Sequence, residues 1–155
     1  MSDDSLAAAL EREHQDIDDE IEVFAAGLAA GTIDAGPLRR ASAALRRHIY
    51  LEEEFLFPPL REAGMVAPVF VMLREHGELW RTLDAIDIEL ALDPDTAALQ
   101  KLCRELVVQL QHHNPKEEQI LYPQADQVLH GEVGSRLKAF IESGQLPEEW
   151  VCERR

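Results

Sequence analysis

Residues 48–58, His-Ile-Tyr-Leu-Glu-Glu-Glu-Phe-Leu-Phe-Pro, have a counterpart in residues 113–123, His-Asn-Pro-Lys-Glu-Glu-Gln-Ile-Leu-Tyr-Pro. Both stretches carry a histidine, a pair of glutamates that begins four residues later, and a Leu-aromatic-Pro ending. A shorter motif, Arg-Glu-His, occurs at residues 12–14 and again at 74–76. Because the short and long motifs alternate along the chain, the sequence indicates two copies of one helical hairpin.

Apolar residues recur every three or four positions in four segments, which is typical of amphipathic helices. We expect these helices to run from Ser5 to Gly31, from Pro37 to Pro58, from Pro68 to Leu90 and from Leu99 to Ile120. Short turns separate them, so the chain is predicted to be all-α: an antiparallel up-down-up-down four-helix bundle. The prolines at 58 and 59 should end or kink the second helix, and Pro115 should kink or break the fourth.

A single domain is expected over residues 1–155, with the bundle spanning about 5–125. Residues 126–155 should form a short amphipathic helical segment and a tail, and this segment is expected to pack across one end of the bundle. Residues 1–4 are expected to be frayed.

The net charge of -15 argues against nucleic-acid binding and against an anionic membrane surface. No stretch reaches the roughly 18 apolar residues of a membrane span. The acidic N-terminus does not resemble a signal peptide, and two cysteines are too few for a disulfide scaffold. These features predict a cytoplasmic protein. The sequence does not determine its oligomeric state, and a monomer or a homodimer is expected.

Each of the four predicted helices has one histidine within its apolar stripe, and two of them add a glutamate one turn later. The inward residues are His14, His48, Glu52, His76, His113 and Glu117. Any one of them alone would more simply be a satisfied core histidine or part of a solvated face. Together they predict a metal site, because a buried carboxylate is costly unless it is paired or binds a cation.

The number of ligands indicates two ions. Four imidazoles and two carboxylates exceed one tetrahedral zinc site, and they suit two ions that share both carboxylates as bridges. Mixed imidazole and carboxylate ligation favours iron, with manganese or zinc as alternatives. The spacing of the apolar residues predicts that His113, and not its neighbour His112, faces inward on the fourth helix.

At these residues the chain resembles the hemerythrin-like, or HHE cation-binding, family, over roughly residues 5–125. The resemblance implies a four-helix bundle around a non-haem di-iron centre, with the six inward residues as ligands. Oxygen-carrying hemerythrins have a second histidine one turn after the third-helix histidine, where this chain has Trp80. Their last carboxylate is an aspartate five residues after its histidine, where this chain offers Glu118 beside Glu117. Asp18 and His112 are further possible ligands.

We therefore expect a protein that binds or senses oxygen, nitric oxide or iron, with a small diatomic or peroxide as ligand and an unidentified redox partner. One alternative is a redox enzyme that reduces peroxide or oxygen or repairs iron–sulfur clusters, and another is a structural bundle with a partner-binding face. Because an indole cannot bind metal, Trp80 predicts an open iron and a poor reversible oxygen carrier.

Several other residues are expected to be structural. Cys103 should be a small core residue, and Cys152 a free thiol in the tail. Tyr50 and Tyr122 should be packing groups, with a bond to a metal-bound species as the alternative. Glu13 and Glu75 should be solvated helix charges, although either could orient an imidazole.

Overall fold

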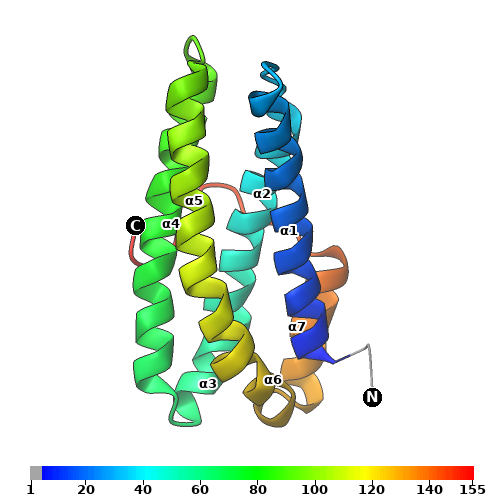
Figure 1. Cartoon of the computed structure of the whole chain (residues 1–155). Coiled ribbons are helices and arrows are strands. Elements are labelled where there is room, and N and C mark those ends of the chain that lie inside the picture. The colour runs from blue at the N-terminus through cyan, green and yellow to red at the C-terminus, as the bar shows by residue number, and fades with distance from the viewer. Residues whose placement is uncertain (1–4) are drawn as a thin grey trace.

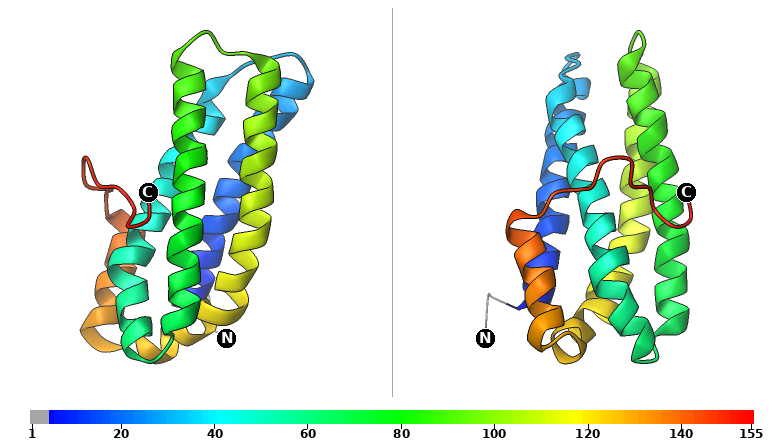
Figure 2. Two further views of the ribbon diagram at one scale, coloured as in Figure 1. Left: turned by 90° about the vertical axis from the view of Figure 1, so that its left-hand side faces the viewer. Right: turned by 180° about the vertical axis from the view of Figure 1, so that it is seen from behind.

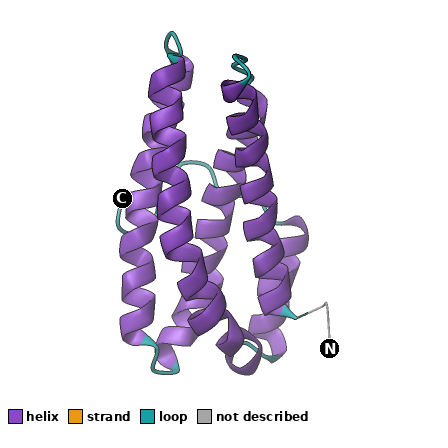
Figure 3. Cartoon of the chain, viewed as in Figure 1, coloured by secondary structure: helices purple, strands orange, loops and turns teal. Residues whose placement is uncertain are grey.

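The computed structural model describes residues 5–155, and the expectation for residues 1–4 lies outside this range. The described chain is helical, with turns and loops but no strand (Figures 1 and 3). Its α-helices are α1 (Leu6–Ala29), α2 (Ala35–Leu51), α3 (Phe57–Glu62), α4 (Val66–Ala91), α5 (Thr96–Lys116), α6 (Tyr122–Val128) and α7 (Gly131–Ser143). Two π-helical segments interrupt them, η1 (Glu52–Leu56) and η2 (Glu117–Leu121). The prediction of an all-helical fold is confirmed.

The four long helices begin within three residues of the predicted starts, but α2 and α5 end at Leu51 and Lys116, before the predicted ends, because the π segments take over there. Side chains cap three of the N-termini: Ser5 accepts from the Ala8 amide (3.1 Å), and Asp34 and Asp95 accept from amides in the first turns of α2 and α5. Helix α1 packs mainly on α2, and α4 packs mainly on α5 (Figure 2). Within residues 5–155, no helix has the length and apolarity needed to cross a membrane.

The expected breaks at the prolines are replaced by π turns at the two glutamates. Pro115 lies inside α5, which continues to Lys116 before η2 begins at Glu117. In the first repeat, Pro58 occupies the second position of α3, where a missing amide hydrogen is tolerated. The two π segments start at equivalent positions of the repeat, so the widened turn is a property of the motif itself. Isolated π turns of this kind are frequent at functional sites.

The C-terminal segment differs from the expectation. It divides at Leu129 and His130 into α6 and α7, and Gly131 adopts a left-handed φ of 67° between them. Helix α7 contacts α1, α2 and η1, so it lies along the bundle and not only across its end (Figure 1). The reason is apolar packing: Leu137 is fully buried, and its neighbours on α7 cover the core residues near the start of α1 and along α3.

Beyond α7 the tail crosses α2 and reaches α4 (Figure 2). It approaches the backbone so closely that a Cβ at Gly77 would lie 2.4 Å from the Arg154 carbonyl oxygen. The Trp150 ring meets Trp80 edge-on at 5.5 Å, and Cys152 is buried beside the His76 carbonyl. Both cysteines are free, as expected, but Cys152 belongs to the core.

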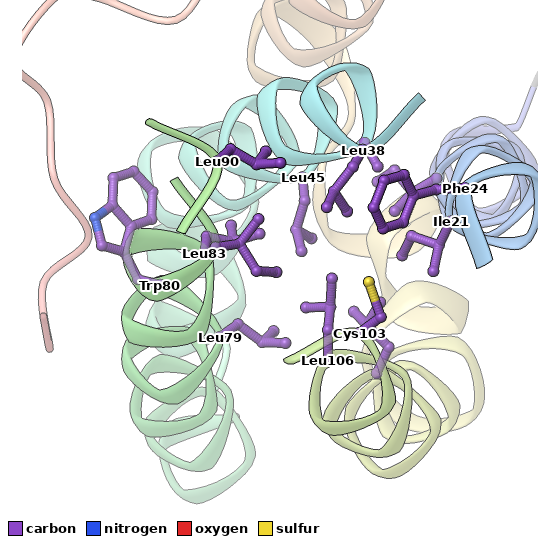
Figure 4. Close-up of a cluster of buried hydrophobic side chains, with 14 of the residues drawn as sticks. Ile21, Phe24, Leu38, Leu45, Leu79, Trp80, Leu83, Leu90, Cys103 and Leu106 are labelled. Carbon is purple, nitrogen blue, oxygen red and sulfur yellow. The ribbon is translucent and has the colours of Figure 1, made fainter. Parts of the chain in front are cut away.

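Two apolar clusters fill the interior. The upper cluster comprises Ile17, Ile21, Phe24, Leu28, Leu38, Ala41, Leu45, Ile49, Leu79, Trp80, Leu83, Ile86, Leu90, Leu99, Cys103, Leu106, Leu110 and Cys152. Figure 4 shows its side chains converging between the helices, with Trp80 turned toward the tail. The lower cluster is built from the start of α1, α3, the start of α4 and the C-terminal helices. On α1 and α4 the inward histidine falls between residues of the two clusters, and on α2 and α5 it lies near the lower end of the upper-cluster residues.

Candidate metal centre

The six inward residues come together in one buried layer between the two apolar clusters. Their donor atoms form two groups, each with all its donor atoms within 4.8 Å of one another. The first group consists of His14, His48, Glu52 and Glu117, and the second of Glu52, His76, His113 and Glu117. Both glutamates are members of both groups, and each group adds two imidazoles. Each group could hold one metal ion, and the two carboxylates would then be shared.

The repeat explains how the groups form. Each glutamate lies one turn after a histidine of its own helix: His48 Nε2 is 3.3 Å from Glu52 Oε2, and His113 Nε2 is 3.1 Å from Glu117 Oε2. Each also reaches a histidine of a more distant helix. Glu52 Oε1 is 3.1 Å from His76 Nε2, and Glu117 Oε1 is 3.1 Å from His14 Nε2. The carboxylates therefore connect the two hairpins at the centre of the bundle.

Every inward imidazole has a second carboxylate on its other nitrogen. The Nδ1 contacts are His14 with Glu118 (2.7 Å), His48 with Glu13 (2.8 Å), His76 with Glu53 (2.7 Å) and His113 with Glu75 (2.8 Å). An Nδ1–H donated to a carboxylate leaves the Nε2 lone pair facing inward, as a metal ligand requires. These four glutamates are called the outer carboxylates below.

The expectation that Glu13 and Glu75 are solvated charges is wrong, since both hold imidazoles. Glu118, considered above as an alternative to Glu117, instead holds His14. The signal was present in the repeat: Glu13 and Glu75 are the middle residues of the Arg-Glu-His motifs, and Glu53 and Glu118 are the second residues of the Glu-Glu pairs. The motif does not show which helix carries the histidine that each of these glutamates contacts.

Glu75→Gln tests the outer carboxylates. The variant keeps the size of the side chain but removes the charge that orients His113, and Lys116 loses its anionic partner. Loss of such a partner typically weakens metal affinity by about 10- to 100-fold. Competition with a chelator measures this loss, and Glu78→Gln, an exposed residue on the same helix, is the matched control. Equal affinities of the two variants would show that Glu75 does not support the site.

Charge in the site is strongly coupled. Burial favours neutral His48, yet the charge of Glu52 and the hydrogen bond to Glu13 raise the pKa of this imidazole to about 10. Burial likewise opposes ionised Glu117, but the charge of His113 and hydrogen bonds from neighbouring imidazoles hold its pKa well below the ordinary value. These shifts favour ionised carboxylates and a cationic His48 in the metal-free protein. A bound cation would replace the imidazole proton as the positive charge beside the carboxylates.

Tyr122 also reaches the centre, which corrects the expectation of a packing role. Its hydroxyl donates to Glu52 Oε2 at 2.6 Å and lies 3.0 Å from Nε2 of both His14 and His48. Burial and the negative charges of Glu117 and Glu52 raise the pKa of Tyr122 well above its ordinary value. The sequence signal for this residue was weak, because the equivalent position of the first repeat is Phe57.

Three buried polar atoms in the described chain form no hydrogen bond of acceptable geometry, although the ion-pair contacts above bring each within about 3.1 Å of a neighbour: Glu52 Oε1, His76 Nε2 and Glu117 Oε2. All three belong to the second group. A buried polar atom without a partner costs about 1–3 kcal/mol, and more when it is charged. A cation between these atoms would satisfy all of them at once, so the residues fit a metal ion.

The remaining candidates lie outside the two groups. His112 is exposed and approaches only the rim of the site, with its Nε2 3.4 Å from Glu75 Oε2. The half-buried Asp18 lines a cavity of about 310 Å³ between α1 and α5, and Glu118 lines the same cavity. The Trp80 ring packs against Trp150 and under the Arg46 guanidinium, on the side of α4 that faces the tail (Figure 4).

The fold and the site together define an all-helical protein with a buried His/Glu centre suited to metal ions. Comparison with family models agrees: the hemerythrin HHE cation-binding domain matches residues 5–125. The chain belongs to this family. Comparisons with curated proteins and with solved structures give no significant match.

Proposed function

We propose that this protein is a non-haem di-iron protein that binds a small ligand, namely oxygen, peroxide or nitric oxide. In this proposal the fold is an antiparallel up-down-up-down four-helix bundle, and the ligands are His14, His48, Glu52, His76, His113 and Glu117. One observation carries it: the two donor groups share the same two buried carboxylates, and each adds its own pair of imidazoles.

The choice of iron rests on the chemistry of the donors and on the family. Both groups combine imidazole nitrogen with carboxylate oxygen, which suits iron, with manganese and zinc as possible substitutes. Neither cysteine belongs to a group, although both are buried elsewhere in the core. Iron would supply one-electron redox changes and coordination positions for an exogenous ligand.

The protein residues hold and isolate the metal pair. The outer carboxylates fix the four imidazole rings, and the apolar clusters above and below exclude water from the layer. His76, for example, is stacked on Phe57 with a ring separation of 5.4 Å and is bonded to Glu53 on its other nitrogen. Rigid ligands of this kind define the positions of both ions before they bind.

A second candidate function is redox catalysis, such as reduction of peroxide or oxygen. It is favoured by the outer carboxylates, because a carboxylate on each imidazole makes the ligand more basic and stabilises the more oxidised metal. The poor oxygen carriage predicted from Trp80 stays a prediction, but its structural basis changes. Trp80 faces the tail, so poor oxygen carriage is now expected from the effect of the outer carboxylates on the metal ligands.

The test of the proposed function is metal analysis of protein expressed with iron. We expect two iron ions per chain, and a nitric oxide complex of the reduced protein visible by electron paramagnetic resonance. His113→Ala should lose at least one ion, whereas His112→Ala should keep both, because His112 is exposed. One ion or none per chain in the unmodified protein would contradict the paired site. Rapid, repeated turnover of peroxide would favour the catalytic candidate.

A further inference from the structure

The sequence repeat relates the two ion positions to each other, but one buried residue beside them differs between the two copies. Tyr122 and Phe57 are each the ninth residue after the histidine of a long motif, and each is the first residue after a π segment. Both are fully buried, and both approach an imidazole: Tyr122 is 5.4 Å from the His14 ring, and Phe57 is 5.4 Å from the His76 ring. The first position therefore has a hydroxyl where the second has only an apolar ring.

The Tyr122 hydroxyl is close to every donor of the first group. It lies 2.6 Å from Glu52 Oε2, 3.0 Å from Nε2 of both His14 and His48, and 3.2 Å from Glu117 Oε1. Adjacent corners of an octahedron with metal–ligand bonds of about 2.1 Å are about 3.0 Å apart. The hydroxyl thus has the spacing of a fifth corner around the ion that these four residues would hold.

We propose that Tyr122 is a ligand of the ion in the first position and binds ferric iron through its phenolic oxygen. This inference rests on the proposed function. On binding, the O–H bond of Tyr122 breaks, its proton passes to solvent, and an O–Fe bond forms from an oxygen lone pair. No electron is transferred, so the iron stays ferric. A phenolate oxygen is an established iron ligand in proteins.

The consequence is an assigned place for the small ligand. The first ion would have five protein ligands, while the second would have four, from Glu52, His76, His113 and Glu117. Phe57 borders the second ion and provides no donor atom. Oxygen, peroxide or nitric oxide would therefore bind preferentially at the second ion, beside Phe57, because that ion has more free positions.

The experiment uses the fact that the chain has two tyrosines. A phenolate bound to ferric iron gives a visible charge-transfer band and resonance-enhanced tyrosine vibrations. We expect both signals in the iron-loaded, oxidised protein and in Tyr50→Phe, in which Tyr122 is the remaining tyrosine. Tyr122→Phe should lose them while keeping two ions. Tyr50 is a suitable control because its ring packs with Phe55, Phe140 and Trp150, outside both donor groups.

Azide binding to the oxidised protein tests the consequence. Six-coordinate iron would have one free position at the first ion of the unmodified protein and two in Tyr122→Phe, so at saturation the variant should bind one azide more per chain than the unmodified protein. Two bound ions without tyrosine signals in Tyr50→Phe would overturn the inference and leave the proposed function standing; this measurement needs no change at Tyr122. Absence of bound metal would instead refute the proposed function itself.

Discussion

Changing Glu52 or Glu117 to alanine is expected to empty both ion positions, lowering the metal content from two ions per chain to none. Each carboxylate belongs to both donor groups, so its removal takes one ligand from each ion and leaves the other carboxylate as the sole bridge. Neither glutamate has any solvent exposure, so water cannot readily replace the lost oxygen atoms. Elemental analysis of the purified variants after iron supplementation measures the effect.

Glu54→Ala is the matched control for this experiment. Glu54 follows the ligand in the same π segment but is exposed, and it bonds only the Trp150 indole in the tail. This variant should keep both ions. Glu52→Gln preserves the volume of the side chain and separates loss of charge from loss of packing. Retention of one ion in Glu52→Ala or Glu117→Ala would mean that the carboxylates are terminal ligands of separate ions.

Raising the pH should strengthen metal binding and weaken the metal-free fold. In the metal-free protein, Glu52 and Glu13 offset the effect of burial and raise the pKa of His48 to about 10. Cationic His48 stabilises this fold fully below its unfolded pKa of about 6.5, and this contribution is lost as the pH rises through 10. Metal binding requires the neutral ring, so affinity should rise roughly tenfold per pH unit over the same window.

Two titrations between about pH 7 and pH 9 test this prediction. Binding of zinc, which is redox-silent, is measured against a competing chelator, and the unfolding of metal-free protein is measured in urea. Glu13→Gln removes one of the carboxylates that raise the pKa of His48, so it should make the metal-free protein less dependent on pH. Metal affinity that does not change with pH would show that His48 is already neutral before the ion binds.

Local patterns were sufficient for the helices and for the inward residues. A helix has a period of 3.6 residues, so the apolar stripe alone shows which side of each helix is buried. His113 and His112 illustrate this: the two residues are adjacent in the chain, yet the His113 side chain is buried and the His112 side chain is exposed. The spacing of four between His48 and Glu52 likewise places both on one face of a single helix.

The π turns and the placement of the C-terminal segment did not follow from local patterns. Proline chemistry predicts an interruption near Pro58 and Pro115, but Pro115 lies within α5, and the helical path instead widens at Glu52 and Glu117. Helix α7 has an ordinary amphipathic pattern, and such a pattern does not specify which part of the bundle it covers. Gly77 is a similar case, because a side chain is excluded there only by the close approach of the Arg154 backbone.

The polar contacts around the inward histidines depend on tertiary structure for the same reason. Glu118 bonds His14 across 104 positions of the chain, and Tyr122 bonds Glu52 across 70. The position of a residue in the helical period shows that its side chain faces inward. It does not show how far one helix is shifted along its axis relative to its neighbours. This axial shift is set by packing of the two apolar clusters above and below the layer, and it brings the Tyr122 hydroxyl level with Glu52.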